Sequence, residues 1–211
     1  MSNLSFKKNI MSLSDYIGNT PIVKLNNIVD KNCAAIWAKL ECMNPAGNLK
    51  ERICISMIED AERKGLIKQG KTRIVEASSG NTGMSMAVYC KIKGYDLIIV
   101  MPENVNKERV QLINVYGGKV LFSPANKGMQ GALDMADYLA ENNNNYFLID
   151  QFENELNPKT HKMNTASEIL NQIEGELDAF VMGIGTGGTI CGVASLLKEK
   201  YPNIKVIAVE P

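Results

Sequence analysis

Short β-rich runs alternate with helical patterns along most of this chain, and this alternation constrains the fold more than any other feature. The run 97–101 is apolar throughout, as expected for a strand covered on both faces. Strand, helix and strand in repeated order predict an α/β protein with mainly parallel sheets and helices on both faces. The predicted strands are 37–41, 72–77, 97–101, 119–123, 146–150, 179–183 and 205–210. The predicted helices are 50–64, 83–93, 105–116, 127–141, 160–173 and 189–200.

Charge and hydropathy exclude several classes of function. The 211 residues include 23 Lys plus Arg and 23 Asp plus Glu, so no net charge attracts nucleic acid or an anionic membrane. No continuous apolar stretch follows Lys7 and Lys8, and no run approaches membrane-spanning length. We therefore expect a cytoplasmic protein that acts on small molecules, with no nucleic-acid or membrane partner.

Cysteine and histidine usage argues against a metal site. The five cysteines are scattered and never paired at two-residue spacing, which argues against a disulfide framework and against a zinc site. Cys54, Cys90 and Cys191 fall on apolar helical stretches and are predicted to be small core residues. His161 is the single histidine, and we expect it at the surface.

A lysine stands where a helix should begin. Turn formers and the plausible N-cap Asn48 precede Lys50, and apolar residues recur at helical spacing from there to Gly65. The positive end of the helix dipole disfavours an ammonium in the first turn by about 0.3–1 kcal/mol, which favours the neutral, nucleophilic amine. Lys50 is therefore a candidate for covalent attachment of an aldehyde cofactor; the alternative is an ordinary solvated lysine.

A glycine-rich loop, 183–189, joins the strand 179–183 to the helix 189–200. Glycines allow close approach of a ligand, and the free amides and dipole of a helix start attract phosphate. The predicted phosphate-binding residues are Gly185, Thr186, Gly187, Gly188 and Thr189. Gly183, Gly185 and Gly188 also match the dinucleotide fingerprint, with Glu210 ending the next strand, so an NAD-binding oxidoreductase is an alternative.

A second polar loop occupies the equivalent place after the strand 72–77. It reads Ser78-Ser79-Gly80-Asn81-Thr82-Gly83, and its hydroxyls and amides converge on a helix start, which suits a carboxylate. Asn81 offers an amide that can bond a ring oxygen. Alone, such a loop is more often a turn with a helix cap. With the phosphate loop and the amine, it indicates pyridoxal phosphate handling an amino acid.

These segments together resemble the fold-type II pyridoxal-phosphate enzymes, most closely the cysteine synthase (O-acetylserine sulfhydrylase) and cystathionine β-synthase group. The resemblance runs nearly end to end, through residues 17–21, 44–52, 79–83, 101–103, 127–129, 151–152, 183–189 and 209–211. It implies a two-lobed, tryptophan synthase β-like fold. Residues 44–154 would form a small mobile lobe for the substrate carboxylate, and residues 17–43 with 155–211 a larger lobe for the cofactor phosphate. The polar region 151–158 is the one boundary that the composition suggests.

The resemblance also implies a role for each candidate residue. Lys50 would hold pyridoxal phosphate as an imine and act as general base, while 185–189 bind the phosphate and Asn81 bonds the 3′-oxygen. The substrate carboxylate would be held by Ser79, Thr82 and Gln151, with Ser78 and Gly80 nearby.

The implied reaction joins a serine derivative, O-acetylserine in a cysteine synthase, with sulfide or another thiol to give cysteine and acetate. Cysteine breakdown with sulfide release and thioether formation are alternatives, as is a catalytically silent binding partner. The resemblance further implies a homodimer and serine acetyltransferase as a partner.

Several positions depart from the family pattern. Asn48 stands where the family usually has serine, Glu51 where it usually has aspartate, and Ala77-Ser78 where proline and threonine are common. Family members continue well past residues 209–211, and that later part normally supplies a serine or threonine to the pyridine nitrogen. We therefore expect a chain that lacks the C-terminal part of the family, as a fragment, a truncated product or a site completed by another chain.

Overall fold

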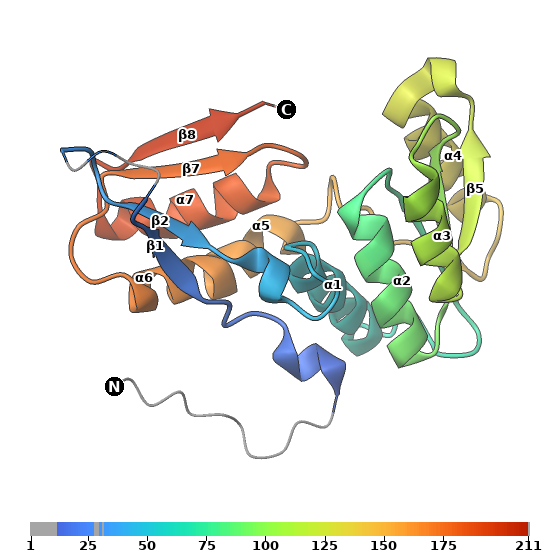
Figure 1. Ribbon diagram of the computed structural model, residues 1–211. Helices are drawn as coiled ribbons and strands as arrows, with labels where there is room; N and C mark the ends of the chain where they lie inside the picture. The colour runs from blue at the N-terminus through green and yellow to red at the C-terminus, as the bar shows by residue number, and fades with distance from the viewer. Residues whose placement is uncertain (1–11, 28–29, 31, 211) are drawn as a thin grey trace.

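The computed structural model describes residues 12–27, 30 and 32–210. Lys7, Lys8 and Pro211, named above, lie outside the described residues. The predicted α/β class is confirmed: a four-stranded sheet with its helices lies at one side of the molecule, and two smaller sheets lie at the other (Figure 1). No helix in the described part of the chain is long and apolar enough to cross a membrane.

The four-stranded sheet is parallel throughout, in the order β5-β4-β3-β6. Its strands are β3 (Arg73–Ala77), β4 (Asp96–Pro102), β5 (Lys119–Ser123) and β6 (Tyr146–Leu148). Every residue of β4 after Asp96 is buried, which explains its continuous apolar run, because helices cover both faces of a parallel sheet. The carboxyl ends of all four strands meet at one edge.

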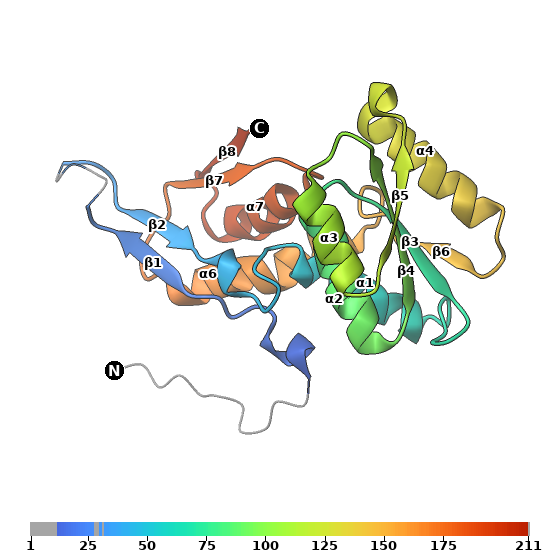
Figure 2. The ribbon, with the colours of Figure 1, turned by 45° about the vertical axis from the view of Figure 1, so that its right-hand side comes forward.

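Strand alternation divides the core of this sheet into two layers. Ile74 and Ile99 point to the face covered by α1 (Glu51–Arg63), α2 (Asn81–Lys93) and α3 (Lys107–Val115). Val75 and Val100 point to the opposite face, where α4 (Gly128–Glu141) packs through two buried alanines. Figure 2 shows α4 and the other helices on opposite sides of the strands. Burying each such aliphatic side chain contributes about 1.5–3 kcal/mol.

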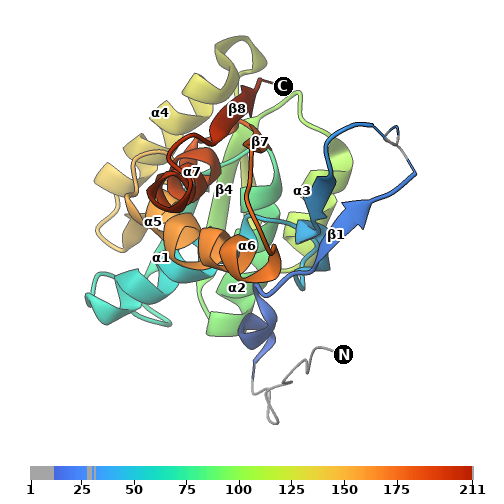
Figure 3. The ribbon, with the colours of Figure 1, turned by 90° about the vertical axis from the view of Figure 1, so that its left-hand side faces the viewer.

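The second part of the molecule is built around α7 (Gly188–Lys200), which packs through Val193 and Leu197. Its strands are the parallel pair β7 (Ala179–Gly183) and β8 (Lys205–Val209) and the antiparallel pair β1 (Ile22–Leu25) and β2 (Ile36–Lys39). Figure 3, seen from this side, shows α7 nearly end-on between β8 and α5. The short 3₁₀ turns are η1 (Leu13–Tyr16), η2 (Glu41–Met43) and η3 (Ala125–Lys127).

One continuous helical segment leads from the first sheet into this second part. It consists of α5 (Leu156–Thr160), a π-helical turn η4 (His161–Ala166) and α6 (Ser167–Gln172). Helix was expected only from residue 160, after Pro158. Pro158 instead lies inside the first turn of α5, where a missing backbone N–H breaks no intrahelical bond.

Two placements expected from the sequence are wrong. His161 is fully buried, because partners for both ring nitrogens satisfy it in the interior. Cys191 is exposed, because it lies on the side of α7 opposite Val193 and Leu197. The predicted burial of Cys54 and Cys90 is confirmed. The strand β1 was not predicted from the sequence.

A buried ion network ties the N-terminal segment to α1. Arg52 makes two hydrogen bonds to Glu41, at 2.7 and 2.8 Å, and two more to Glu168 at the same distances. Its side chain is 1% exposed. Lys39 adds a 2.8 Å ion pair to Glu168. Because Arg52 is the second residue of α1, the network joins the start of α1 to η2 and α6.

Candidate active site

Lys50 occupies the position just before the first residue of α1 and is half-buried. Asn48, expected as the N-cap, lies two residues earlier; its Oδ1 accepts the Lys50 backbone N–H at 2.9 Å and the Ser85 hydroxyl at 3.0 Å. The expectation that Asn48 is the N-cap is wrong, because the helix begins at Glu51 and Asn48 lies in the loop before it. Its side chain orders that loop. Burial lowers the pKa of the Lys50 amine. The predicted shift toward a neutral amine is confirmed in direction, with burial as its main cause.

The loop before Lys50 is held by a buried carboxylate. Glu51 accepts the backbone N–H of Ala46 at 2.8 Å and that of Asn48 at 3.0 Å. Its Oε2 also accepts the Tyr89 hydroxyl at 2.6 Å. Between these anchors Gly47 has a φ of +81°, a conformation that glycine adopts without cost. These hydrogen bonds fix the backbone before Lys50 and therefore the direction in which the Lys50 side chain projects.

The second polar loop follows β3 and opens α2. Ser78 is buried, and its hydroxyl oxygen accepts the backbone N–H of Gly80 at 3.3 Å and of Gly83 at 3.1 Å. Thr82 donates a 2.6 Å hydrogen bond to Gln151 Oε1, and Gln151 Nε2 donates to the Ala77 carbonyl at 3.1 Å. The structure thus brings Thr82 and Gln151, 69 positions apart, into direct contact.

Ser79 and Asn81 lie at the open side of this loop. Ser79 is half-buried, and its carbonyl accepts a 2.6 Å hydrogen bond from Arg109. Asn81 is exposed. Neither side chain hydrogen-bonds to another residue within the described part of the chain. Unlike Ser78 and Thr82, they therefore make no side-chain hydrogen bond that supports the fold of the loop.

The glycine-rich loop follows β7 and opens the thirteen-residue helix α7. A Cβ added to Gly185 or to Gly187 would meet nothing within 4 Å, so the loop backbone faces open space. Gly187 has a φ of +81° and turns the chain into α7. The free amides and positive dipole end of α7 therefore face a space that suits a phosphate group.

Two side chains connect the predicted segments. Asn157 donates one amide hydrogen to the Gln151 carbonyl at 2.9 Å and the other to the Thr186 hydroxyl at 2.8 Å. His161 Nε2 lies 3.1 Å from the Thr189 hydroxyl, and the charge of Lys50 acts on the same imidazole. Asn157 thus joins Gln151 to the glycine-rich loop 183–189, and the Lys50 amine lies near enough for its charge to act on His161 beside that loop. In Figure 1 the β7–α7 loop points toward the start of α2.

The sequence did not indicate Asn157 and His161 as site residues. Asn157 belongs to the polar region 151–158, which was predicted only as a boundary, and His161 was predicted to be a surface residue after it; neither has a motif spacing of its own. The asparagine–proline pair before a helix marks a turn, and this local signal says nothing of a contact 29 positions away.

A buried acid lies behind the carboxylate loop. Glu76 in β3 is 1% exposed, and burial raises the pKa of its carboxyl to about 8. The Gln151 backbone lies close enough to lower this pKa in part. Within the described residues, however, no donor reaches either carboxyl oxygen with hydrogen-bond geometry. Glu76 is therefore held mostly neutral at pH 7.

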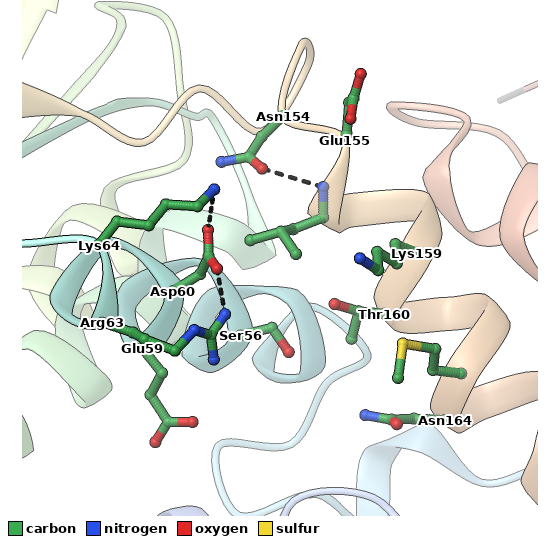
Figure 4. A pocket seen from close by; sticks show the side chains of 12 residues that line it. Ser56, Glu59, Asp60, Arg63, Lys64, Asn154, Glu155, Lys159, Thr160 and Asn164 are labelled. Carbon is green, nitrogen blue, oxygen red and sulfur yellow. Dashed lines mark hydrogen bonds and ion pairs between the residues drawn. The ribbon is translucent and has the colours of Figure 1, made fainter. Parts of the chain in front are cut away.

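A separate hollow of about 620 Å³ lies between α1 and α5 (Figure 4). Asp60 projects into it and binds Lys64 at 2.7 Å and also Arg63. Side chains of both charges line the hollow, and none of the predicted site residues is among them. It is distinct from the candidate active site.

The fold and the site together define a pyridoxal-phosphate-dependent enzyme. The chain belongs to this family: residues 13–211 match the family described as pyridoxal-phosphate dependent enzyme. A cysteine synthase of Staphylococcus aureus (strain Mu50 / ATCC 700699) is 47% identical to it over 206 residues, which cover 97% of this chain and 66% of the relative. This membership decides against the nicotinamide-dependent oxidoreductase that the glycine fingerprint left open.

Solved structures agree with this assignment. A hydrogen sulfide-producing enzyme from Fusobacterium nucleatum superposes with a TM-score of 0.90 at 46% identity, covering 96% of this chain and 67% of that one. An O-acetylserine sulfhydrylase isoform 3 from Entamoeba histolytica gives a TM-score of 0.87 at 36% identity, covering 100% and 64%. The predicted fold-type II architecture is confirmed, and the chain spans about two thirds of the length of the relatives that it matches.

Proposed function

We propose that this protein is a cysteine synthase, which replaces the β-substituent of a serine derivative, O-acetylserine, with sulfide to release cysteine and acetate. The relatives' names support this reaction. The observation that carries it is the meeting of three groups: the half-buried amine of Lys50, the loop of Ser78 to Thr82 with Gln151, and the open loop at the start of α7.

The residues present fit pyridoxal phosphate. Lys50 would hold it covalently, the amides of 185–189 with the hydroxyls of Thr186 and Thr189 would hold its phosphate, and Asn81 would bond its ring oxygen. When bound, this cofactor supplies an electron sink that stabilises negative charge at the substrate α-carbon. The open backbone at Gly185 and Gly187 supports this placement, since no side chain fills the space before α7.

The rest of the reaction falls to residues of the chain. Ser79, Thr82 and Gln151 would hold the substrate carboxylate and thereby present the α-hydrogen to Lys50, a proximity effect. The Lys50 amine would take that proton, and burial, which lowers its pKa, shifts it toward the neutral form that can do so. Gln151 is already held by Ala77 and Thr82, so its side chain requires little ordering when substrate binds.

We further propose that residues 44–154 form a small lobe that closes over residues 17–43 and 155–211. The hydrophobic clusters around the four-stranded sheet and around α7 are separate, which supports this division, while Ile17 and Leu156 of the larger lobe pack at the edge of the first. Closure would exclude water from the reacting centre. The homodimer, the serine acetyltransferase partner and the cytoplasmic location that the resemblance implies stay predictions.

The decisive experiment locates the cofactor before it measures turnover. Purified protein is loaded with pyridoxal phosphate, reduced with borohydride and digested, and mass spectrometry should find the label on Lys50. The unreduced protein is then supplied with O-acetylserine and sulfide, and cysteine is measured. Lys50→Ala should lose both the label and the activity and keep the fold. Label on another lysine would refute the assignment.

Sulfide release from cysteine is a second candidate reaction. The Fusobacterium neighbour is named as a hydrogen sulfide-producing enzyme and is 46% identical to this chain. Both reactions need the same amine, phosphate loop and carboxylate loop. Supplying cysteine alone and measuring sulfide distinguishes them: faster sulfide release from cysteine than cysteine formation from O-acetylserine would favour the second reaction.

A further inference from the structure

Two buried side chains lie behind the phosphate loop and contact its two threonines. Asn157 is 2% exposed and His161 is 0% exposed. Asn157 Nδ2 lies 2.8 Å from the Thr186 hydroxyl oxygen, and His161 Nε2 lies 3.1 Å from that of Thr189. A hydroxyl has one hydrogen to donate, so its partners decide where that hydrogen points.

At Thr186 the direction follows from donor chemistry. The side-chain amide of Asn157 is oriented by the Gln151 carbonyl, which can only accept, so its NH₂ group must face both Gln151 and Thr186. The Thr186 oxygen also accepts the Gly188 backbone N–H at 3.4 Å. Since both partners donate, the Thr186 hydrogen points elsewhere.

At Thr189 the direction depends on the protonation of His161. Burial, with the positive charges of Lys50 and Arg52, lowers the pKa of His161 to about 3, so the ring is neutral and carries one N–H. The Thr165 hydroxyl lies 2.9 Å from Nδ1 and has no other hydrogen-bond partner in the described part of the chain. Its hydrogen is satisfied by donation to Nδ1, which leaves the ring proton on Nε2.

We propose that Asn157 and His161 are positioning residues: by donating to Thr186 and Thr189, they leave both threonine hydroxyls free to donate to a phosphate group. The identity of that phosphate as the one on pyridoxal phosphate rests on the proposed function. The reverse ring tautomer would turn the Thr189 hydrogen toward His161, and the Thr189 oxygen would then present only lone pairs to an anion.

The ring tautomer can be measured in the unsubstituted protein. His161 is the only histidine of the chain, so protein made with ¹⁵N-histidine and no histidine tag gives the signals of one imidazole. We expect ¹⁵N shifts of a neutral ring protonated at Nε2, with and without inorganic phosphate. A ring protonated at Nδ1 would overturn the proposal, whether or not the protein has cysteine synthase activity.

Binding of two matched probes tests the consequence for an anion. Pyridoxine 5′-phosphate and pyridoxine differ by the phosphate and lack the aldehyde that reacts with Lys50. His161→Leu and Asn157→Leu should each weaken pyridoxine 5′-phosphate binding about tenfold to a hundredfold, as expected for a lost charge-assisted hydrogen bond, and leave pyridoxine binding unchanged.

Conservative variants separate positioning from packing. His161→Gln keeps an N–H donor and should retain phosphate affinity within about threefold, which is less than the tenfold to hundredfold loss expected when a charge-assisted hydrogen bond is removed. Lys162→Ala, at an exposed ion pair with Glu199, serves as the control. Unchanged phosphate binding in His161→Leu, or equal losses for both probes, would overturn the proposal.

Discussion

The Tyr89 hydroxyl lies 2.6 Å from Oε2 of Glu51, and this buried hydrogen bond joins the middle of α2 to the first residue of α1. The same carboxylate holds the backbone of Ala46 and Asn48. Tyr89 therefore supports, from a neighbouring helix, the loop that presents Lys50.

Tyr89→Phe should destabilise the protein by about 1.5–3 kcal/mol, because it removes a hydrogen bond to a buried charged group and adds no replacement. Urea unfolding at pH 7 measures the change. Tyr138→Phe is the matched control, since Tyr138 is 64% exposed, and should change stability by less than about 0.5 kcal/mol. Equal effects of the two substitutions would show that the Glu51 contact contributes no stability.

Arg52→Met should cost about 3–5 kcal/mol of unfolding free energy, because it leaves Glu41 and Glu168 without their buried partner. Arg52→Lys should not restore this loss, since an ammonium cannot make two paired contacts with each carboxylate. Arg63→Met removes an exposed ion pair with Asp60 and should cost about 0–1 kcal/mol. A small loss in Arg52→Met would contradict the structural importance of the network.

Glu76→Gln should stabilise the protein at alkaline pH more than at acidic pH. The pKa of Glu76 is raised from 4.5 to about 8, so its contribution to stability is fully present below pH 4.5 and is lost as the pH rises toward 8. The loss amounts to ~1.4 kcal/mol per pH unit inside that window. Thermal unfolding of both proteins at pH 5 and pH 9 gives the difference; a pH-independent difference would contradict the burial of a neutral acid.

Gly188→Ala should destabilise the cofactor-free protein, whereas Gly185→Ala should not. A Cβ on Gly188 would lie 1.9 Å from Asn157 Oδ1, which forces the asparagine from its place, and a Cβ on Gly185 would meet nothing within 4 Å. Each variant adds one methyl group to the same loop. The difference between their melting temperatures therefore reports the steric clash at Gly188. Similar melting temperatures would show that Asn157 moves aside without cost.

Local patterns account for what was predicted correctly. The apolar run of β4 shows that both of its faces are covered, and each of the two polar loops lies where a parallel strand ends and a helix begins, although the strands β3 and β7 belong to different sheets. The position of Lys50 at a helix start was predicted correctly because a helix start is recognisable from its neighbours. In each case the signal lies within about ten residues.

Contacts between distant segments account for what was missed. His161 becomes buried because α7 packs closely on α5 and η4: a Cβ on Gly192 would lie 2.1 Å from the Pro158 carbonyl oxygen and 2.9 Å from the His161 Cβ. Tyr89 and Glu51 are 38 positions apart, and Asn157 and Thr186 are 29 apart. A polar residue within such a contact has the same local sequence signal as a polar residue on the surface. The sequence therefore showed neither the burial of these residues nor their contacts.

The π-helical turn η4 makes this region tolerant of a change in chain length. A π turn holds one residue more than an α turn, so deleting a residue between His161 and Ala166 would let the segment close as a regular α-helix. Because the wider turn absorbs the extra residue, the helix beyond it would keep nearly the same angle about its axis, and Glu168 would stay at Arg52 while Asn157 stayed at Thr186. In the regular helix α7, by contrast, a one-residue deletion would rotate everything beyond it by about 100°. A single-residue deletion inside η4 should therefore be less damaging than one in the middle of α7.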